Sequence, residues 1–313
     1  MLPIELLLPT LLLGVLLDRW LGEPRRWHWL VGFGRLAGWL ESRLNRGGGR
    51  LIGVLTLLLA VLPLPVLLLW LHLQWAGQPW LQALLAAGCL YLALGGRSLV
   101  EHAEAVAVPL HRGDLAAARK RVGWIVSRET ASMDERQVSI ATVESVLENG
   151  NDALFAALFW CLIGGAPAVI LFRLVNTLDA MWGYKTERYH RFGWAAARLD
   201  DLLGWLPARL TALSYALAGD TRTALRCWRD QAAACASPNG GPVMCAGAGA
   251  LNAQLGGTVI YHGKAVEKPP MGSGRWADGA AIDGAIRLLR RSLVLWLVAV
   301  ALFSLPWLSG GTL

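Results

Sequence analysis

The sequence predicts an all-α fold: a polytopic integral membrane protein with helical cytoplasmic segments, in a single domain over residues 1–313. Two observations predict it. Hydrophobic residues make up 55% of the chain and charged residues only 16%, whereas ordinary soluble domains are about 25% charged. The charge-free stretches are also long enough for a bilayer, which takes about 20 apolar helical residues to cross. This composition argues against a soluble enzyme and against a disordered chain.

Five stretches are predicted to lie in the membrane, because each is apolar and nearly free of charge. They are residues 3–17, 51–71, 80–95, 153–172 and 292–308. The second and third form a hairpin whose polar turn, at 72–79, is flanked by tryptophan. The chain has 16 tryptophans against six phenylalanines. An aromatic ring with one polar edge suits the membrane–water interface, so this excess supports the assignment.

The basic residues indicate which side each segment faces. All 29 lysines and arginines fall in four segments, 18–50, 97–152, 173–201 and 202–291. By the positive-inside rule, the first two of these lie in the cytoplasm and the hairpin turn lies outside. The net charge of +7 favours anionic membrane lipids as partners. No basic-aromatic repeat or zinc-finger spacing accompanies it, so nucleic acid is not an expected partner.

Segment 153–172 leaves two alternatives open, because a full crossing there would put the basic segment 173–201 outside. Either 202–218 crosses back, although a proline and an arginine interrupt it, or 153–172 is re-entrant and broken at 164–167. A broken helix is tolerated in a membrane where protein covers the freed backbone groups. We favour the re-entrant alternative. The expected location is the inner cell membrane, with several passes and the active face in the cytoplasm.

Three acids follow one another at helical spacing. Glu144, Glu148 and Asp152 stand four residues apart, so a helix would stack them on one face, where like charges repel. A divalent cation such as Mg²⁺, or an amine, would relieve the repulsion, because hard cations take carboxylate oxygens. The alternative is a solvated face on which these acids pair with Arg128 or Arg136.

A second polar cluster follows segment 153–172. On one helix Asn176, Asp179 and Gly183 share a face, and Arg173 lies one turn before them. Charged groups at a membrane boundary usually mark function or extend to the head groups. The long Arg173 side chain fits either role, whereas the short Asp179 side chain indicates function.

Two adjacent acids, Asp200 and Asp201, are candidate metal ligands. Neighbouring side chains on a helix point about 100° apart, so the two need not share one ion. The alternative is a charge pair near a helix N-terminus, where the helix dipole favours acids.

A glycine-rich region lies towards the C-terminus. Residues 237–240 predict a tight turn, and the small residues 246–250 predict close backbone packing. A loop of this kind can present N–H groups to phosphate. Residues 257–264 superficially resemble a P-loop, but five residues separate the glycines instead of four, and Ala265 stands where a Ser or Thr would hold Mg²⁺. They are therefore not interpreted as one.

In combination, these motifs resemble the cobinamide-phosphate synthase family of cobalamin biosynthesis, the CbiB/CobD proteins. The most specific matches are Asn176-Thr177-Leu178-Asp179, Gly183-Tyr184-Lys185 and Ser237-Pro238-Asn239-Gly240. The others are Arg128-Glu129-Thr130, Glu144-Ser145, Glu148-Asn149, Asp152, Gly164-Gly165, Arg173, Phe192-Gly193, Asp200-Asp201 and Pro207-Ala208-Arg209. The likeness extends over nearly the whole chain from Asp18 onward.

The chain departs from the family pattern at two places. The early GDP…HPV element appears here as Gly22-Glu23-Pro24 and His28-Trp29-Leu30. The RDT motif appears as Arg128-Glu129-Thr130, which keeps an acid at its centre.

The resemblance implies an adenosylcobinamide-phosphate synthase, a carbon–nitrogen ligase that uses ATP and Mg²⁺. Such an enzyme joins adenosylcobyric acid, a corrinoid, to aminopropanol or aminopropanol phosphate through an amide bond. The carboxylate must be activated, for which an acyl phosphate is suitable, so cations are needed to neutralise phosphate oxygens. A carboxylate is also useful to accept the proton of the amine.

These requirements assign roles to the polar residues. The expected catalytic residues are Asp179, Lys185 and Glu148. The residues expected to bind ATP or substrate are Arg173, Asn176, Thr177, Asn149 and Asn239, with the arginine on phosphate and the asparagines as orienting groups. The expected metal ligands are Glu144, Glu148, Asp152, Asp200 and Asp201.

Two other functions remain as alternatives. A broken helix with charges at the membrane boundary is typical of the substrate pathway of a transporter, although the spans are few and no inverted repeat is visible. The chain could also be a membrane scaffold, without activity, for other enzymes of cobalamin assembly. The sequence leaves open the nucleotide site, the phosphorylation of the amine and the number of subunits, a homo-oligomer being one alternative.

Overall fold

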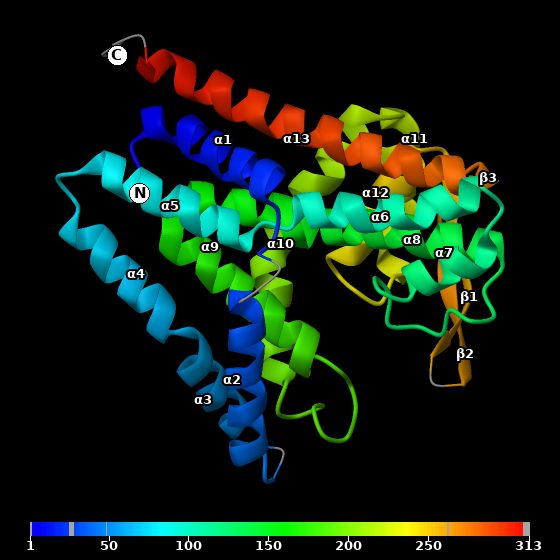
Figure 1. The fold of residues 1–313 in the computed structure, drawn as a ribbon, viewed down its shortest axis with the longest axis horizontal. Coiled ribbons are helices and arrows are strands. Elements are labelled where there is room, and N and C mark those ends of the chain that lie inside the picture. Colours follow the sequence, from blue (N-terminus) through cyan, green and yellow to red (C-terminus); the bar gives the residue numbers. More distant parts are fainter. Residues whose placement is uncertain (1, 25–27, 48, 262, 309–313) are drawn as a thin grey trace. The chain divides into compact units, whose positions relative to one another are not determined.

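The computed structural model describes residues 2–24, 28–47, 49–261 and 263–308. The chain is mostly helical (Figure 1). It divides into two compact units, each of which is described by itself. Unit 1 comprises Met1–Gly95, Ala156–Gly204 and Val300–Leu313, and unit 2 comprises Gly96–Phe155 and Trp205–Ala299.

Unit 1 is built from helices. They are α1 (Ile4–Leu21), α2 (Trp29–Leu44), α3 (Arg50–Val61), α4 (Pro63–Gln74), α5 (Pro79–Ala93), α9 (Ala156–Trp182) and the first part of α10 (Trp194–Ala218). Helix α5 packs against α1 and α9, and α4 packs against α9. Gly14 permits the close approach of α1, because a Cβ at this position would lie 2.7 Å from a methyl group of the buried Leu90. A core of this kind resists added volume.

Unit 2 combines helices with a small sheet. Its helices are α6 (Gly96–His111), α7 (Leu115–Val122), α8 (Glu135–Gly150), the π-helical turn η1 (Asn151–Phe155), the rest of α10, α11 (Thr221–Gln231), η2 (Ala232–Ala234), α12 (Gly240–Ala250) and most of α13 (Gly279–Leu308). The strands β1 (Ala253–Tyr261), β2 (Lys264–Gly272) and β3 (Arg275–Trp276) lie in the order β2-β1-β3. Helix α12, made largely of Gly and Ala, packs against α8, α11, β1 and β2, which confirms the close packing predicted for residues 246–250.

The sheet corrects the prediction of an all-α fold. Strands β1 and β2 form an antiparallel pair in which Thr258 lies opposite Glu267 and donates a hydrogen bond of 2.7 Å to it. Residues 257–261 belong to β1 and Lys264 begins β2, so this segment is not the strand–loop–helix of a P-loop. The strand pattern was missed because two glycines interrupt β1 and two prolines interrupt β2, and both residue types are unfavourable inside strands.

Within the described residues, two helical stretches are long and apolar enough to cross a membrane. They are Pro79–His111, which contains an 18-residue window with a mean hydropathy of 1.6, and Glu135–Trp182, which contains one with 2.2. Helices α3 and α4 would supply a third if they act as one span, although they are bent by 41°, at a point where Pro63 begins α4. The predicted membrane segments 3–17, 51–71, 80–95, 153–172 and 292–308 are helical over nearly all of their length; that each lies in the membrane stays a prediction.

Helix α9 has an interruption where the glycine-rich break was predicted. Gly164 (φ −140°, ψ 17°) and Gly165 (φ 60°, ψ −145°) are not helical. The positive φ of Gly165 is a conformation that glycine adopts without strain. Whether the segment crosses the membrane or re-enters it stays a prediction.

A buried carboxylate links α2 to the segment that follows α9. Glu41 accepts hydrogen bonds from Arg188 Nε at 2.9 Å and Nη2 at 2.7 Å, and from Asn45 Nδ2 at 2.9 Å. Asn45 also donates to the carbonyl oxygen of Arg188. These contacts, with that of Arg188 the largest, lower the pKa of Glu41 from its ordinary value of 4.5.

We therefore expect the Glu41 carboxylate to stabilise the folded protein only above acidic pH. Its pKa is lowered on folding, so its contribution is complete above pH 4.5 and is lost as the pH falls through the lower folded pKa. Glu41→Gln should reduce the melting temperature by a few degrees at pH 7, and this difference should shrink at pH 3. Melting curves of both proteins at the two pH values test this, and a difference that is independent of pH would contradict it.

Candidate functional site

The residues assigned roles from the sequence fall into two groups, one in each unit. The group in unit 2 contains Glu144, Glu148, Asn149, Asp152 and Asn239. The group in unit 1 contains Arg173, Asn176, Thr177, Asp179, Lys185, Asp200 and Asp201.

Helix α8 carries most of the group in unit 2. It begins with a capping box, in which Asp134 accepts a hydrogen bond from the Gln137 N–H at 2.7 Å and the Gln137 side chain accepts one from the Asp134 N–H at 2.9 Å. From Val138 to Leu147 every residue of α8 is buried. This part of the helix, which includes Glu144, therefore lies in the interior of unit 2.

Glu144 is the centre of a buried ion network. Its side chain is 2% exposed and accepts hydrogen bonds from Arg128 Nη2 at 2.6 Å and Lys268 Nζ at 2.7 Å. The sequence alternative in which the acids pair with Arg128 is thus confirmed for Glu144, although the face is buried instead of solvated. Arg136 lies over the ring of Trp276. The metal role predicted for Glu144 conflicts with these contacts, because its charge is already balanced by two cations.

Glu148 lies against the turn that precedes α12. A Cβ at Gly240 would come within 2.6 Å of Glu148 Oε1, so the absence of a side chain at Gly240 makes room for the carboxylate. Ser237 Oγ accepts hydrogen bonds from the N–H groups of Gly240 at 2.9 Å and Asn239 at 3.3 Å. The turn predicted at 237–240 is thus present, and it adjoins a predicted catalytic acid.

Arg209 holds this turn in place. Its Nη1 donates to Asn239 Oδ1 at 2.7 Å and its Nη2 donates to the carbonyl oxygen of Pro238 at 2.9 Å. The guanidinium also lies over the Trp205 ring, 4.7 Å from its centroid. Two motifs that are 30 residues apart in the sequence are therefore joined by direct hydrogen bonds.

The surroundings of Glu148 disfavour its charge. Burial, together with the negative charges of Asp152 and Glu144, raises the pKa of Glu148 to about 7, and the cations Lys268 and Arg128 oppose this only in part. Glu148 precedes the uncharged stretch 153–172, and its neighbours are the polar groups of unit 2. A carboxyl group with this pKa can both accept and release a proton near neutral pH.

Asp152 lies in the π-helical turn η1, which directly follows α8. The Asn151 side chain donates to Asp152 Oδ1 at 2.8 Å and accepts from Thr211 Oγ1 at 2.9 Å. The wider turn changes the predicted stacking after Glu148, yet Asp152 still raises the pKa of Glu148. π-helical turns inside α-helices are frequent at functional sites. Asn149 is exposed and donates to the carbonyl and hydroxyl oxygens of Ser145.

The contact between Gly240 and Glu148 leads to a prediction. In Gly240→Ala the added methyl would overlap Glu148 Oε1, which is the far end of a flexible side chain, so the carboxylate must turn away at little cost in stability. We expect a melting temperature close to that of wild type and a reduced activity. Gly38→Ala is the matched control, because a Cβ at this helical position meets nothing within 4 Å; if both variants behave as wild type, the contact has no role.

The group in unit 1 links the end of α9 to α10. Arg173 Nη1 donates to Asn176 Oδ1 at 3.4 Å, and Asn176 Nδ2 donates to Asp200 Oδ1 at 3.2 Å. Asp201 contacts Arg198 at 3.3 Å. Thr177 Oγ1 donates to the carbonyl oxygen of Arg173. Arg173 and Asn176, predicted in one cluster, are thus brought together with Asp200 from another motif.

The end of α9 depends on a second close contact with glycine. The Gly183 N–H donates to the carbonyl oxygen of Asp179 at 2.7 Å, and the Asp179 carboxylate lies where a side chain at Gly183 would be. This confirms that the two residues share a face. Lys185 follows two residues later and is exposed.

Among residues 2–24, 28–47, 49–261 and 263–308, no group of three or more His, Cys, Asp or Glu side chains is arranged to hold a metal ion. The metal roles of Glu148, Asp152, Asp200 and Asp201 stay predictions. The sequence analysis did not find Lys268, which lies 124 residues from Glu144, because its strand was not predicted. Arg209 stood in a recognised motif, but nothing in the pattern indicated its partner.

The fold and these residues define a class: a mainly helical protein with helices of membrane length, which carries buried carboxylates beside cations and a glycine-rich turn. The family described as CobD/Cbib protein matches residues 11–289, and the chain belongs to this family.

Similar proteins span nearly the same length. One from Stutzerimonas stutzeri is 55% identical over 92% of this chain and 94% of its own, and one from Chromobacterium violaceum is 53% identical over 91% and 92%. One from Mycobacterium tuberculosis (strain H37Rv) is 39% identical over 89% and 90%. All three are named cobalamin biosynthesis protein CobD. No solved structure matches the chain.

Proposed function

We propose that this chain is an adenosylcobinamide-phosphate synthase, an enzyme that joins adenosylcobyric acid to aminopropanol or aminopropanol phosphate with ATP. The role in cobalamin biosynthesis is supported by membership of the CobD/CbiB family and by the names of the relatives. The particular reaction is supported above all by one observation, the half-buried Glu148 carboxylate, with its raised pKa, beside the glycine-rich turn.

The reaction needs an activated acyl group and a base. An oxygen of the corrin carboxylate attacks the γ-phosphorus of ATP, which gives an acyl phosphate and ADP. The amine nitrogen then attacks the acyl carbon, the C–N bond forms, and phosphate leaves with the former carboxylate oxygen. The amine must lose a proton in this step. We assign its acceptance to Glu148, because a group with a pKa near 7 is suited to general base catalysis at neutral pH.

Cations are needed where phosphate charge develops. In unit 1, Arg173 is oriented by Asn176, which in turn is bound to Asp200, and Lys185 is exposed. These two residues are the proposed phosphate ligands, with Asp179 beside them in the sequence. Mg²⁺ would be supplied with ATP and would neutralise its phosphate oxygens, since Mg²⁺ is commonly held by substrate phosphates and one or two carboxylates. The Glu144 carboxylate does not fit this role.

The proposed location is the inner cell membrane, with several passes. It is supported by the two helices of membrane length and by the exposed apolar side chains of α3 and α4, among them Leu55, Leu59, Val66 and Trp70. Apolar surface of this extent usually contacts lipid or another protein. The partners included in the proposal are the corrinoid, the amine, membrane lipids and other enzymes of cobalamin assembly.

The assignment of Asp179 and Lys185 can be tested by substitution. We expect Asp179→Asn and Lys185→Ala, when correctly inserted in the membrane, to lower the rate of amide formation at least tenfold. The loss of a cation should weaken phosphate binding, so KM for aminopropanol phosphate should rise in Lys185→Ala. Lys120→Ala, in α7, is a control for the removal of a lysine. Wild-type rates in both variants would remove these residues from the site.

One experiment distinguishes an enzyme from a transporter. The purified protein is reconstituted in liposomes, and corrin amidation and corrinoid uptake are measured on the same sample. The proposal predicts ATP-dependent amide formation without net uptake. Uptake without amide formation would favour a transporter, and neither activity would favour a scaffold.

A further inference from the structure

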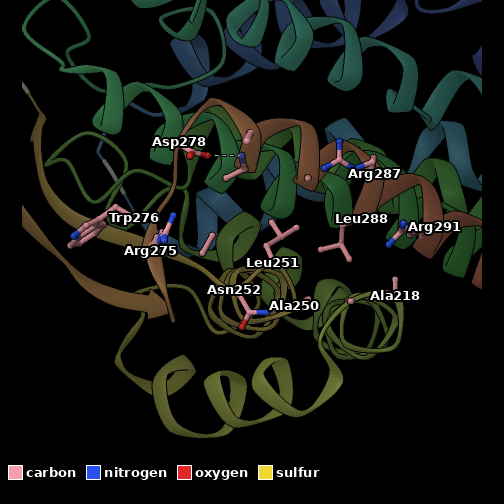
Figure 2. A pocket seen from close by; sticks show the side chains of 15 residues that line it. Ala218, Ala250, Leu251, Asn252, Arg275, Trp276, Asp278, Arg287, Leu288 and Arg291 are labelled. Carbon is pink, nitrogen blue, oxygen red and sulfur yellow. Dashed lines mark hydrogen bonds between the residues drawn. The ribbon is translucent and has the colours of Figure 1, made fainter. Parts of the chain in front are cut away.

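A pocket of about 370 Å³ lies in unit 2, and none of the residues assigned above lines it. Its walls come from the ends of α10 and α12, from β3 and from the first four turns of α13. Figure 2 shows these side chains from close by. The volume is within the range of sites that bind small molecules.

The sheet positions one end of the pocket. Strand β3 pairs in parallel with β1, with Ala253 opposite Arg275 and Gln254 opposite Trp276. The ring of Trp276 is covered on one face by the Arg136 guanidinium, 5.2 Å from the ring centroid, and 40% of the residue stays exposed. An aromatic surface is therefore held at this end by strand pairing and by a cation.

The pocket has an excess of positive charge. It contains three arginines, Arg275, Arg287 and Arg291, against one acid, Asp278. The acid caps α13 by accepting the Ala281 N–H at 3.0 Å. Within the part of the chain that the structure describes, the side chains of the three arginines are exposed and form no hydrogen bond or ion pair. Their neighbour Arg290, which lies outside the pocket, pairs with Glu104 at 3.2 Å.

The arginines occupy the ends of an elongated space. Arg287 and Arg291 are four residues apart, so they share one face of α13, and Figure 2 shows them at the opposite end from Arg275 and Trp276. Leu251 and Leu288 lie between these ends (Figure 2), and several Ala and Gly residues also line the pocket. With a rise of about 1.5 Å per residue, α13 covers about 20 Å between Asp278 and Arg291.

We propose that this pocket binds a phosphate-bearing ligand, with its phosphate on Arg287 and Arg291 and its body along Leu251 and Leu288 towards Trp276. Arginine suits phosphate because its planar fork donates two hydrogen bonds at once, and an indole ring suits a planar group by stacking. A nucleoside polyphosphate has this shape and chemistry. The head group of an anionic phospholipid carries the same phosphate, and Arg291 directly precedes the apolar end of α13.

If the ligand is a nucleotide, the inference rests on the proposed function, because the pocket would then hold its ATP, and Arg173 and Lys185 would bind the phosphate of the amine or of the acyl phosphate instead. Binding is therefore measured without corrin or amine, so that a failure of amide formation does not count against the pocket. The full chain is placed in nanodiscs of zwitterionic lipid and titrated with ATP, with inorganic phosphate as competitor. Arg287→Gln combined with Arg291→Gln should weaken ATP binding at least tenfold, and Arg275→Gln should weaken it less.

Arg290→Gln is the matched control, because it removes the same charge from the same helix but outside the pocket, and ATP binding should change less than twofold. A second arm uses nanodiscs that contain phosphatidylglycerol, with bound lipid counted by native mass spectrometry. Lipid retention that is lost only in the double variant would identify the source of the phosphate as a head group. Equal binding of ATP, phosphate and anionic lipid by wild type and double variant would overturn the proposal.

Discussion

Glu144→Gln should destabilise the protein by about 3–5 kcal/mol, because it removes the negative charge from a buried network and leaves two cations behind. Arg128 is 7% exposed and Lys268 is 23% exposed, so neither can recover its hydration fully in the folded state. Glutamine keeps the shape of the side chain and can still accept a hydrogen bond, so the loss reports on charge. The melting temperature should fall on the order of 10 °C.

Glu101→Gln is the control for this prediction. Glu101 pairs with Arg97 at 2.6 Å, but the pair lies on an exposed helix surface, and such pairs contribute about 0.5 kcal/mol or less. Melting curves of the purified proteins in detergent decide the matter. If Glu144→Gln has the same melting temperature as Glu101→Gln, the network does not stabilise the protein.

Glu148→Gln should lower the rate of amide formation by about 10²–10⁴-fold, the range that a positioned general base contributes. The substitution keeps the size of the side chain beside Gly240 but removes its capacity to accept a proton. The loss should appear in kcat, while binding of the corrinoid stays close to wild type. A variant with wild-type kcat would assign the proton to another group.

The same substitution should make the folded protein more stable above neutral pH. The pKa of Glu148 is about 7 in the folded protein, against an ordinary value of 4.5. Between these pH values the folded state keeps a proton on Glu148 that the unfolded state has released, so stability is lost as the pH rises. The substituted glutamine side chain would carry no charge and would avoid this loss. Melting at pH 8 and pH 5 tests this: the variant should exceed wild type at pH 8 only. A structural defect would instead lower both melting temperatures.

Local patterns were enough to predict the helices and several contacts. Uncharged stretches of membrane length became helices, and the break in α9 falls at the predicted glycines, because hydrophobicity and backbone freedom are properties of neighbouring residues. Spacing on one helix also placed Asp179 beside Gly183 and Arg173 beside Asn176.

Contacts between distant segments were beyond this reasoning. Lys268 reaches Glu144 because β2 and α8 both pack against α12. The strands were not predicted because glycines interrupt β1 and prolines interrupt β2. The hydrogen bond from Arg209 to Asn239 depends on the tertiary position of α10. The pocket at β3 and α13 was not predicted for the same reason, since its walls come from α10, α12, β3 and α13, which meet only in the folded unit.

The most direct test of the central claim is an isotope measurement with the wild-type protein. Adenosylcobyric acid labelled with ¹⁸O in its free carboxylate is incubated with the amine, ATP and the protein in nanodiscs, and the corrinoid and phosphate products are analysed by mass spectrometry. The account predicts an amide whose formation transfers one ¹⁸O to each phosphate released. Absence of the amide, with intact protein and all substrates present, would contradict it.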